Sequence, residues 1–392
     1  MKLRKIVDGV LLGGALDWNR RLFDSLIPLP DGTSYNAYVI SGSEKTVLLD
    51  AVDPKVADTL MAQLDEVPKI DYVVAHHGEQ DHSGVIPMVI DRYPEAKVVV
   101  SSKGKPILMD HLSLNEDKFL VVEDGQEIAL GGKTLKFIYT PWVHWPETMV
   151  TYLKEDRILF SCDFFASHLA TTEMFVRDEP QAYKAAKRFF AEIMMPFRPV
   201  VAKNLDKLEP YAIDMIAPSH GQIYDNPAFI VDAYRKWVGS EPHNLVCIPY
   251  VTMHGSTHIM VEHLTDQLVS RGVVVEQFDL PVTDIGDLAV SLVDAATIVV
   301  GTPTVLVGPH PHAAYAAVLA NALKPKAKFA AIIGSYGWGS KAVETIQSLI
   351  PNLKVEVLGA VLTKGHPKAD ALAELDKLAE AIAQKHRELG VL

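Results

Sequence analysis

The chain has 392 residues, of which 48% are hydrophobic, and a formal net charge of −12 at pH 7. This length allows two domains with separate cores, and the acidic balance argues against a protein that binds nucleic acid. No apolar run approaches the roughly 18 residues of a membrane span, and the N-terminus lacks the apolar core of a signal peptide. We therefore expect a cytoplasmic protein without a membrane segment.

The first 160 residues read mainly as strands and hairpins. Strand-like runs at residues 38–40 and 46–50 flank a turn at residues 41–45, and helical stretches are expected at residues 55–64 and 182–194. Mixed strands and helices of this kind predict an αββα sandwich.

Four side chains that can bind a metal follow directly after the apolar run at residues 72–75; they are His77, Glu79, Asp81 and His82. The Val-rich run predicts a buried strand that ends at this loop, and residues 85–90 suggest a helix just beyond it. Imidazole and carboxylate ligands together suit zinc, iron or manganese. The motif alone has an ordinary alternative, because surface loops often carry His, Asp and Glu by chance.

Three later residues strengthen the metal-site hypothesis. His144, Asp163 and His220 each lie at the end of an apolar run that reads as a strand. A sandwich would deliver side chains from such strand ends to one rim, so we expect all seven residues to meet there. Seven ligands predict a pair of metal ions, which is a common catalytic arrangement.

The only two cysteines, Cys162 and Cys247, lie in apolar runs and are expected to be buried thiols.

A polar stretch at residues 239–244 divides the chain, and we place the boundary between domains 1–243 and 244–392. Beyond it, strands and helices alternate strictly. The expected strands cover residues 245–250, 273–278, 296–300, 328–334 and 354–359, and the expected helices cover 256–271, 285–294, 311–323, 341–350 and 369–389. Five strand–helix units predict a doubly wound, five-stranded parallel sheet.

Three loops at the carboxyl ends of these strands form a candidate ligand site. The first loop places hydroxyl groups and a glycine at a helix N-terminus, which is typical of a phosphate nest, although such hydroxyls are most often plain N-caps. The third loop carries an aromatic pair between glycines, which suits the walls of a site for a flat ring. The candidate residues are Thr252, Met253, His254, Gly255, Ser256 and Thr257, then Thr302, Pro303, Thr304 and Gly308, then Ser335, Tyr336, Gly337, Trp338 and Gly339.

The spacing of the seven ligands resembles the metallo-β-lactamase fold, written here as His77-x-Glu79-x-Asp81-His82 followed by His144, Asp163 and His220. Hydrolases of that fold usually have His at the position of Glu79. This difference, together with the second half of the chain, resembles the flavodiiron proteins over essentially the whole sequence. The three C-terminal loops resemble those that bind FMN in flavodoxin-like domains. One departure is the apolar stretch at residues 305–307, where relatives often have a polar segment containing Asn. The resemblance therefore does not identify the residues that would form hydrogen bonds with the edge of the flavin.

The resemblance implies an oxidoreductase with FMN and two non-haem irons that reduces dioxygen to water, nitric oxide to nitrous oxide, or both. It places His77, Glu79 and His144 on one iron, Asp81, His82 and His220 on the other, and Asp163 between them. It also implies a head-to-tail homodimer or a dimer of dimers. The electron donor would be a separate rubredoxin or a reduced deazaflavin or nicotinamide, since the chain has no C-x-x-C pair for a rubredoxin module of its own.

The carboxylates of Glu79, Asp81 and Asp163 also favour iron on physical grounds, because anionic oxygen ligands prefer hard ions such as ferric iron over zinc. Two alternatives stay open. The first is a dinuclear zinc hydrolase with an appended flavodoxin domain, which metal analysis would identify. The second is a flavin electron carrier with an inert N-terminal scaffold, but a scaffold has no reason to concentrate buried polar groups.

Four other histidines have less direct roles in this interpretation. His76 is expected to be buried or to support the site from outside, and His168 is a candidate to line the gas pocket. His310 and His312 flank the second flavin loop and are expected on the surface.

Overall fold

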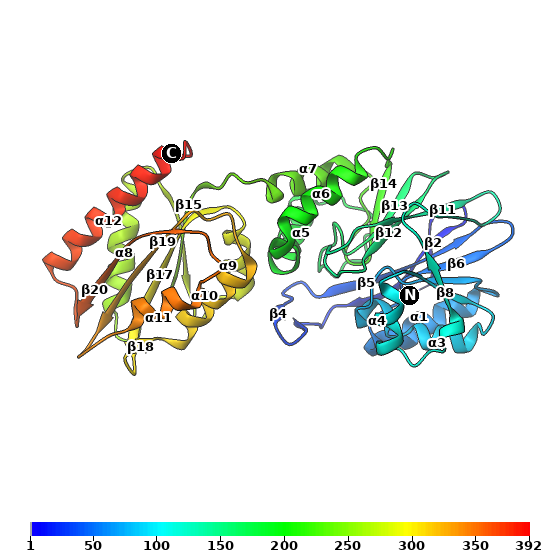
Figure 1. Cartoon of the computed structure of the whole chain (residues 1–392), viewed down its shortest axis with the longest axis horizontal. Coiled ribbons are helices and arrows are strands. Elements are labelled where there is room, and N and C mark those ends of the chain that lie inside the picture. Colours follow the sequence, from blue (N-terminus) through cyan, green and yellow to red (C-terminus); the bar gives the residue numbers. More distant parts are fainter. Residues whose placement is uncertain (1) are drawn as a thin grey trace. The chain divides into compact units, whose positions relative to one another are not determined.

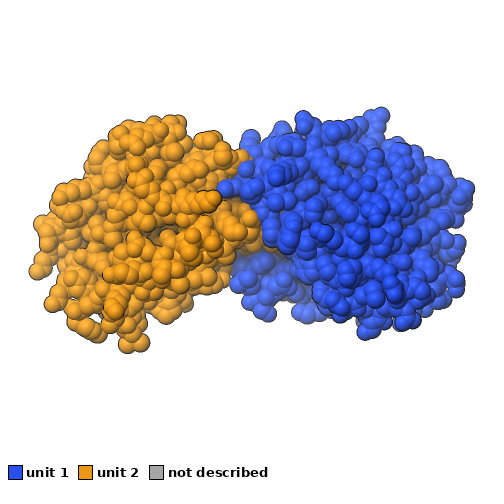
Figure 2. Space-filling model, viewed as in Figure 1, with its two compact units in different colours: residues 1–190, 197–238 blue, residues 191–196, 239–392 orange. Residues whose placement is uncertain are grey.

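The computed structural model describes residues 2–392, which form two compact units, one made of residues 2–190 and 197–238 and the other of residues 191–196 and 239–392 (Figures 1 and 2). Each unit has its own sheets and its own core. Among the described residues, no helix combines the length and the apolar character that a membrane crossing requires.

The first unit contains two sheets that face each other. The first sheet has the order β1 (Arg4–Val7), β2 (Val10–Asp17), β5 (Thr33–Ser41), β6 (Thr46–Leu49), β7 (Tyr72–Val74), β8 (Lys97–Ser101) and β9 (Phe119–Val122). The second has the order β10 (Glu127–Ala129), β11 (Thr134–Tyr139), β12 (Met149–Leu153), β13 (Ile158–Cys162) and β14 (Met215–Pro218). A small hairpin, β3 (Leu22–Phe23) and β4 (Ile27–Pro28), stands apart.

Alternation along β6 shows why the sheets stack. Val47 and Leu49 belong to the cluster that fills the space between the two sheets, whereas Leu48 belongs to the cluster under the helices. Successive strand residues point to opposite faces, so a continuous apolar strand is buried on both sides. The helices of the first layer are α1 (Ala57–Gln63), α3 (Ile86–Arg92) and α4 (Gly104–His111), and those of the other layer are α5 (Glu179–Phe189), α6 (Arg198–Leu208) and α7 (Pro227–Val238). The predicted αββα sandwich is confirmed.

Two details differ from the sequence expectation. The loop after β7 contains a four-residue helix, α2 (Gln80–Ser83), which carries two of the candidate ligands. The helix expected over residues 182–194 begins at Glu179, and its α-helical part ends at Phe189, followed by a wide π-helical turn at Phe190–Met194. Pro196 follows this turn, and proline cannot donate the backbone hydrogen bond that would continue a regular helix.

The second unit is a parallel sheet with helices on both faces. Its strand order is β16 (Val274–Asp279), β15 (His243–Tyr250), β17 (Ala295–Val305), β19 (Phe329–Tyr336) and β20 (Glu356–Lys364), which is the flavodoxin-like order 2-1-3-4-5. The short strand β18 (Gly308–Pro309) pairs antiparallel with the end of β17. The helices are α8 (Ser256–Val269), α9 (Ile285–Leu292), α10 (Pro311–Leu323), α11 (Ala342–Leu349) and α12 (Ala369–Glu388). The predicted five-stranded parallel sheet is confirmed, with β18 as an addition.

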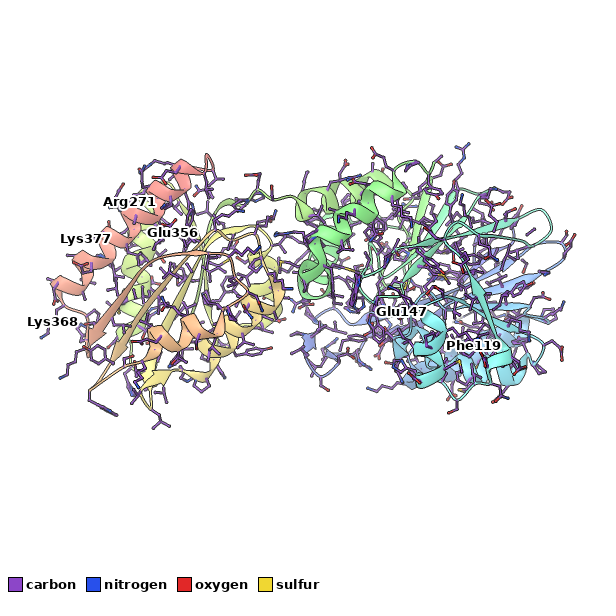
Figure 3. All side chains as sticks on the ribbon, in the orientation of Figure 1. Phe119, Glu147, Arg271, Glu356, Lys368 and Lys377 are labelled. Carbon is purple, nitrogen blue, oxygen red and sulfur yellow. The ribbon has the colours of Figure 1, made fainter. Side chains whose placement is uncertain are left out.

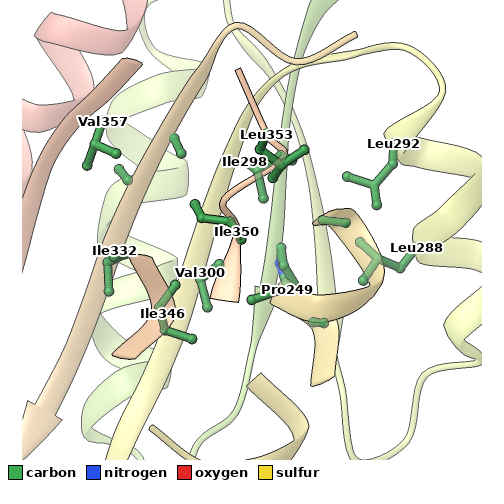
Figure 4. Close-up of a pocket in the computed structure, with 15 residues that line it drawn as sticks. Pro249, Leu288, Leu292, Ile298, Val300, Ile332, Ile346, Ile350, Leu353 and Val357 are labelled. Carbon is green, nitrogen blue, oxygen red and sulfur yellow. The ribbon is translucent and has the colours of Figure 1, made fainter. Parts of the chain in front are cut away.

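Helices α8 and α12 pack together on one face of this sheet through Leu264, Leu375 and Ile382, among other residues. Helices α9, α10 and α11 cover the other face, where Figure 4 shows the side chains around a small apolar cavity of about 20 Å³. Leu288, Leu292 and Ile346 are among the residues that line it, and no charged side chain does. A cavity this small and apolar is a packing gap in the core rather than a cofactor site.

Candidate metal centre and cofactor cavity

The loop after β7 has a backbone that tolerates only a small residue at its centre. A Cβ atom on Gly78 would come within 2.7 Å of Ile107 and 3.3 Å of the carboxylate of Glu147. The Gly78 N–H donates a hydrogen bond of 2.9 Å to Glu147 Oε1. Glu147, which is labelled in Figure 3, is buried. This contact fixes the loop between the end of β7 and α2, so that His77 and Glu79 project to the same side as Asp81 and His82.

Four of the predicted ligands form one group. Glu79 Oε2 lies 3.0 Å from His144 Nε2 and 3.3 Å from His77 Nε2. Asp163 Oδ2 lies 3.2 Å from each of the same two nitrogen atoms. The ligand atoms of these four residues therefore converge within the span of one metal ion.

Three predicted ligands form a second group beside the first. Asp81 Oδ2 lies 3.1 Å from His220 Nε2, and Asp81 Oδ1 lies 3.5 Å from His82 Nε2. The other oxygen of Asp163, Oδ1, lies 3.3 Å from His82 Nε2 and 3.4 Å from His220 Nε2. Asp163 thus presents one oxygen to each group, which is the arrangement that a bridging carboxylate requires.

The second group also has the chemistry of a cation site. Within residues 2–392, both oxygens of Asp81 and Oδ1 of Asp163 are buried without a hydrogen-bond partner. His82 Nε2 and His220 Nε2 lie only 3.3 Å apart. Buried carboxylate oxygens without partners are costly, and a cation between them and the imidazole lone pairs would remove that cost. The residues present therefore fit a pair of metal ions.

The carboxyl groups of Glu79 and Asp163 are held in their charged form. Burial alone would raise the pKa of Glu79, but hydrogen bonds from His144 and His77 outweigh burial and bring that pKa well below its usual range. Burial likewise opposes ionisation of Asp163, and His82, His144 and His77 together lower its pKa well below the usual range. The site therefore offers anionic oxygen ligands.

A second layer of contacts orients the imidazoles. His220 Nδ1 donates a hydrogen bond of 2.6 Å to the backbone oxygen of Ser34 on β5. His76 is buried and is held by Asp50 Oδ2 and by Thr151 Oγ1, each at 2.8 Å. The burial expected for His76 is confirmed. Asp50 was not singled out in the sequence, although it follows β6 directly, just as the ligand loop follows β7.

His168 lies beside the second group, with its ring centroid 5.0 Å from that of His220. Its Nδ1 pairs with Thr33 Oγ1 at 2.8 Å, and its Nε2 is buried without a hydrogen-bond partner in the described chain. Burial, followed by the charge of His220, lowers the pKa of His168 well below its usual value, so this imidazole is neutral.

The candidate flavin residues surround a cavity of about 320 Å³ at the carboxyl ends of β15, β17 and β19. Its lining contains Thr252, Met253, His254, Ser256, Thr257, Pro303, Thr304, Ser335, Tyr336, Gly337 and Trp338, all of which were candidates, together with Gly365. Four other candidates, Gly255, Thr302, Gly308 and Gly339, do not line it. Gly365 had no distinctive sequence motif, and its N–H donates to the backbone oxygen of Tyr336 at 2.8 Å.

This cavity offers the groups that a flavin phosphate and ring need. Gly255 is the N-cap of α8 with a φ of +87°, a conformation that favours glycine, so the hydroxyls of Ser256 and Thr257 begin the helix at the cavity. The side chain of Trp338 is 86% exposed and therefore available as an aromatic wall. The apolar loop contains Leu306 and Val307, with φ values of +48° and +74°, at the tip of the β17–β18 hairpin.

Comparisons with known proteins show the family of this chain. A family model described as "ODP family beta lactamase" matches residues 33–221. A nitric oxide reductase of Moorella thermoacetica is 33% identical over 97% of this chain and 98% of its own length. A type A flavoprotein of Rhodobacter capsulatus is 33% identical over 94% of this chain and 88% of its own length. The solved structure of rubredoxin oxygen:oxidoreductase from Desulfovibrio gigas covers 100% of both chains with a TM-score of 0.95 and 29% identity. Other solved structures of this fold are described as flavodiiron proteins.

Proposed function

Because this chain belongs to the family of flavodiiron proteins, we propose that it uses electrons from an external donor to reduce dioxygen to water, nitric oxide to nitrous oxide, or both. As a flavodiiron oxidoreductase it has FMN and a non-haem diiron centre as its cofactors. The observation that carries the proposal is the pair of carboxylate–imidazole groups that share Asp163.

The proposal assigns His77, Glu79 and His144 to one iron, Asp81, His82 and His220 to the other, and Asp163 to both. The residues supply three carboxylates, which offset the charge of two iron ions and favour iron over softer metals. Bound FMN and iron would supply the redox chemistry, which no side chain of this protein can provide alone.

The protein contributes orientation and exclusion of water. Asp81, His82, Asp163 and His220 are all almost completely buried, whereas Glu79 and His144 are partly exposed. A gas would therefore reach the site from the side of Glu79 and His144. Fixed carboxylates in a site that excludes water keep their geometry when the charge of the metals changes.

The second unit would hold FMN in the cavity bounded by Thr252, Ser256 and Trp338. Hydroxyls and backbone N–H groups at the start of α8 suit the phosphate, because a helix N-terminus favours an anion without basic side chains. We propose that the two cofactor-binding domains comprise residues 1–243 and 244–392.

The donor and the assembly are also proposals. The name of the Desulfovibrio gigas enzyme supports a rubredoxin as the donor, and a reduced deazaflavin or nicotinamide is the other candidate. The family resemblance supports a head-to-tail homodimer or a dimer of dimers. The cytoplasmic location stays a prediction from composition and charge.

Metal analysis and gas kinetics test the function. We expect about two irons and about one FMN per chain in anaerobically purified protein. The reduced protein should be oxidised in a stopped-flow instrument by dioxygen, nitric oxide or both. Stoichiometric zinc, with no turnover under any iron-loading condition, would overturn the proposal in favour of a hydrolase.

A further inference from the structure

Cys162 occupies an unusual backbone position at the edge of the metal centre. It is the last residue of β13, directly before Asp163, and it is 1% exposed. Its φ is +54°, in the left-handed region that residues with a side chain rarely adopt. The pairing of β13 with β14 shifts between Phe160 and Cys162, and Ser219 donates a hydrogen bond of 2.9 Å to the Cys162 backbone oxygen. A bulge of this kind turns a side chain in a new direction.

The bulge directs the thiol of Cys162 toward two metal ligands. Its Sγ lies 3.3 Å from His77 Nδ1 and 3.9 Å from His82 Nδ1, and the latter nitrogen also has Asp50 Oδ2 at 3.8 Å. The Nε2 atoms of the same two rings lie 3.2 Å and 3.3 Å from the two oxygens of Asp163. The sulfur therefore lies on the Nδ1 side of both rings, and the metal-binding carboxylate lies on the Nε2 side.

A histidine that binds a metal through Nε2 must carry its proton on Nδ1, and this N–H needs an acceptor that fixes the angle of the ring. For His220 the acceptor is the backbone oxygen of Ser34. For His77 it is Cys162 Sγ, the one hydrogen-bond partner that residues 2–392 give to that nitrogen. Sulfur is a weaker hydrogen-bond acceptor than oxygen, so it polarises the Nδ1–H bond of the imidazole less.

We propose that Cys162 is a positioning residue whose single sulfur atom orients His77 of one metal and His82 of the other. The proposal rests on the proposed function for the identity of the metal, but it requires only that both imidazoles bind a metal through Nε2. In this role Cys162 is not itself a ligand, because its Sγ lies on the Nδ1 side of both rings and the carboxylate of Asp163 lies on the Nε2 side.

The test compares whole-protein variants at the only two cysteines of the chain. Cys162→Ala removes the acceptor, and competition with a ferrous chelator under anaerobic conditions should show iron affinity reduced by about 10–100-fold. The EPR spectrum of the half-reduced protein should change, while FMN content should stay the same. Cys162→Ser retains an acceptor and should lose less affinity than Cys162→Ala.

Cys247→Ala is the matched control, because Cys247 is equally buried but lies on β15 in the other unit, with its Sγ beside Ser291 Oγ. It should bind iron and give the EPR spectrum of the wild-type protein. Wild-type iron affinity and an unchanged EPR spectrum in Cys162→Ala would overturn the proposal. If Cys162→Ala fails to fold, Cys162→Gly decides, because glycine favours the φ of +54° at this position and also removes the acceptor; identity with wild type in both measurements then overturns the proposal.

The two proposals fail in different ways. If the wild-type protein holds no iron, the proposed function fails, and the role of Cys162 is then measured with Co²⁺ bound to the metal-free protein. The visible spectrum and affinity of Co²⁺ should change in Cys162→Ala and not in Cys247→Ala. Equal behaviour of both variants would overturn the role of Cys162, whatever the natural metal is.

Discussion

Asp163 shows how a single residue can join two groups of ligands. Its two oxygens face different pairs of imidazoles, at distances from 3.2 Å to 3.4 Å. Its position at the end of β13 follows from an apolar strand that the sequence already shows. Neither group would be complete without it, so its replacement should affect both metals rather than one.

Glu79 is the residue that separates this chain from the hydrolases of the same fold, and it gives the first prediction. Glu79→His should weaken iron retention and gas reduction by at least about tenfold, because it removes an anionic ligand and adds a third imidazole beside His77 and His144. FMN should stay bound. Iron content after chelator challenge and turnover with each gas measure the effect.

Glu147→Gln is the control for Glu79→His. Glu147 is a buried glutamate of the segment before β12 whose Oε1 accepts the N–H of Gly78, next to Glu79 in the sequence, and an amide oxygen can replace that acceptor. This variant should keep its iron. Full iron content and activity in Glu79→His would show that the carboxylate does not select the metal.

The sequence was sufficient to propose seven ligands, which the structure brings together, but not to find the residues behind them. Each candidate ligand lies in a polar loop after an apolar run, which is a visible pattern. Asp50 follows a strand and Glu147 precedes one, but neither belongs to a cluster of candidate ligands like the one at residues 77–82. The role of Cys162 depends on a bulge and a positive φ, which an apolar strand pattern cannot reveal.

At the scale of elements, the second unit was the more predictable one, because every strand–helix unit repeats one pattern. Helix α10 begins at Pro311 and ends at Leu323, as the sequence predicted, since Pro suits the first turn and Lys324 adopts the left-handed conformation that ends the helix. Strand β18 was missed because Leu306 and Val307, two apolar residues with positive φ, do not resemble a hairpin turn.

The C-terminal end of α12 gives a second prediction, which concerns pH. His386 is fully buried and pairs with Thr297 Oγ1 on β17 and with Asn244 Oδ1 on β15, each at 2.8 Å. Burial lowers the pKa of His386 to about 4. The unfolded chain binds this proton near pH 6.5, so the neutral imidazole contributes stability above that pH, which is lost as the pH falls toward 4.

The loss should amount to about 2–3 kcal/mol in the free energy of unfolding of the second unit between these pH values. Calorimetric unfolding of the whole protein at a series of pH values measures it. His386→Gln cannot take up this proton, so the stability of the second unit should fall less steeply on acidification. His366→Gln, at an exposed position in the same unit, should follow the wild-type curve. Parallel curves for wild type and His386→Gln would contradict the assignment.

At the scale of the whole molecule, the two proposed cofactor sites belong to different units, so electrons must pass from one unit to the other. The family resemblance implies that this transfer occurs between chains, in a head-to-tail dimer. A two-fold interface of this kind uses the same surface on both chains, and each dimer would then contain two equivalent FMN–diiron pairs. The sequence predicts this arrangement only through the resemblance, because no single-chain pattern specifies which surface meets a partner.

A mixed dimer of two inactive variants tests transfer between chains. The first variant carries Asp163→Ala and keeps its flavin, and the second carries bulky substitutions at Gly255 and Ser256 and keeps its irons. Each variant alone should be inactive. In the co-expressed heterodimer no chain has both cofactors, but one FMN of the first variant would face one diiron centre of the second. Activity should return to roughly half of the wild-type value if the two pairs act independently.

The measurement is the activity of the heterodimer, which is purified through two different affinity tags and assayed for cofactor content. A folded heterodimer with both cofactors and no recovered activity would mean that electrons pass within one chain, and the head-to-tail arrangement would have to be abandoned.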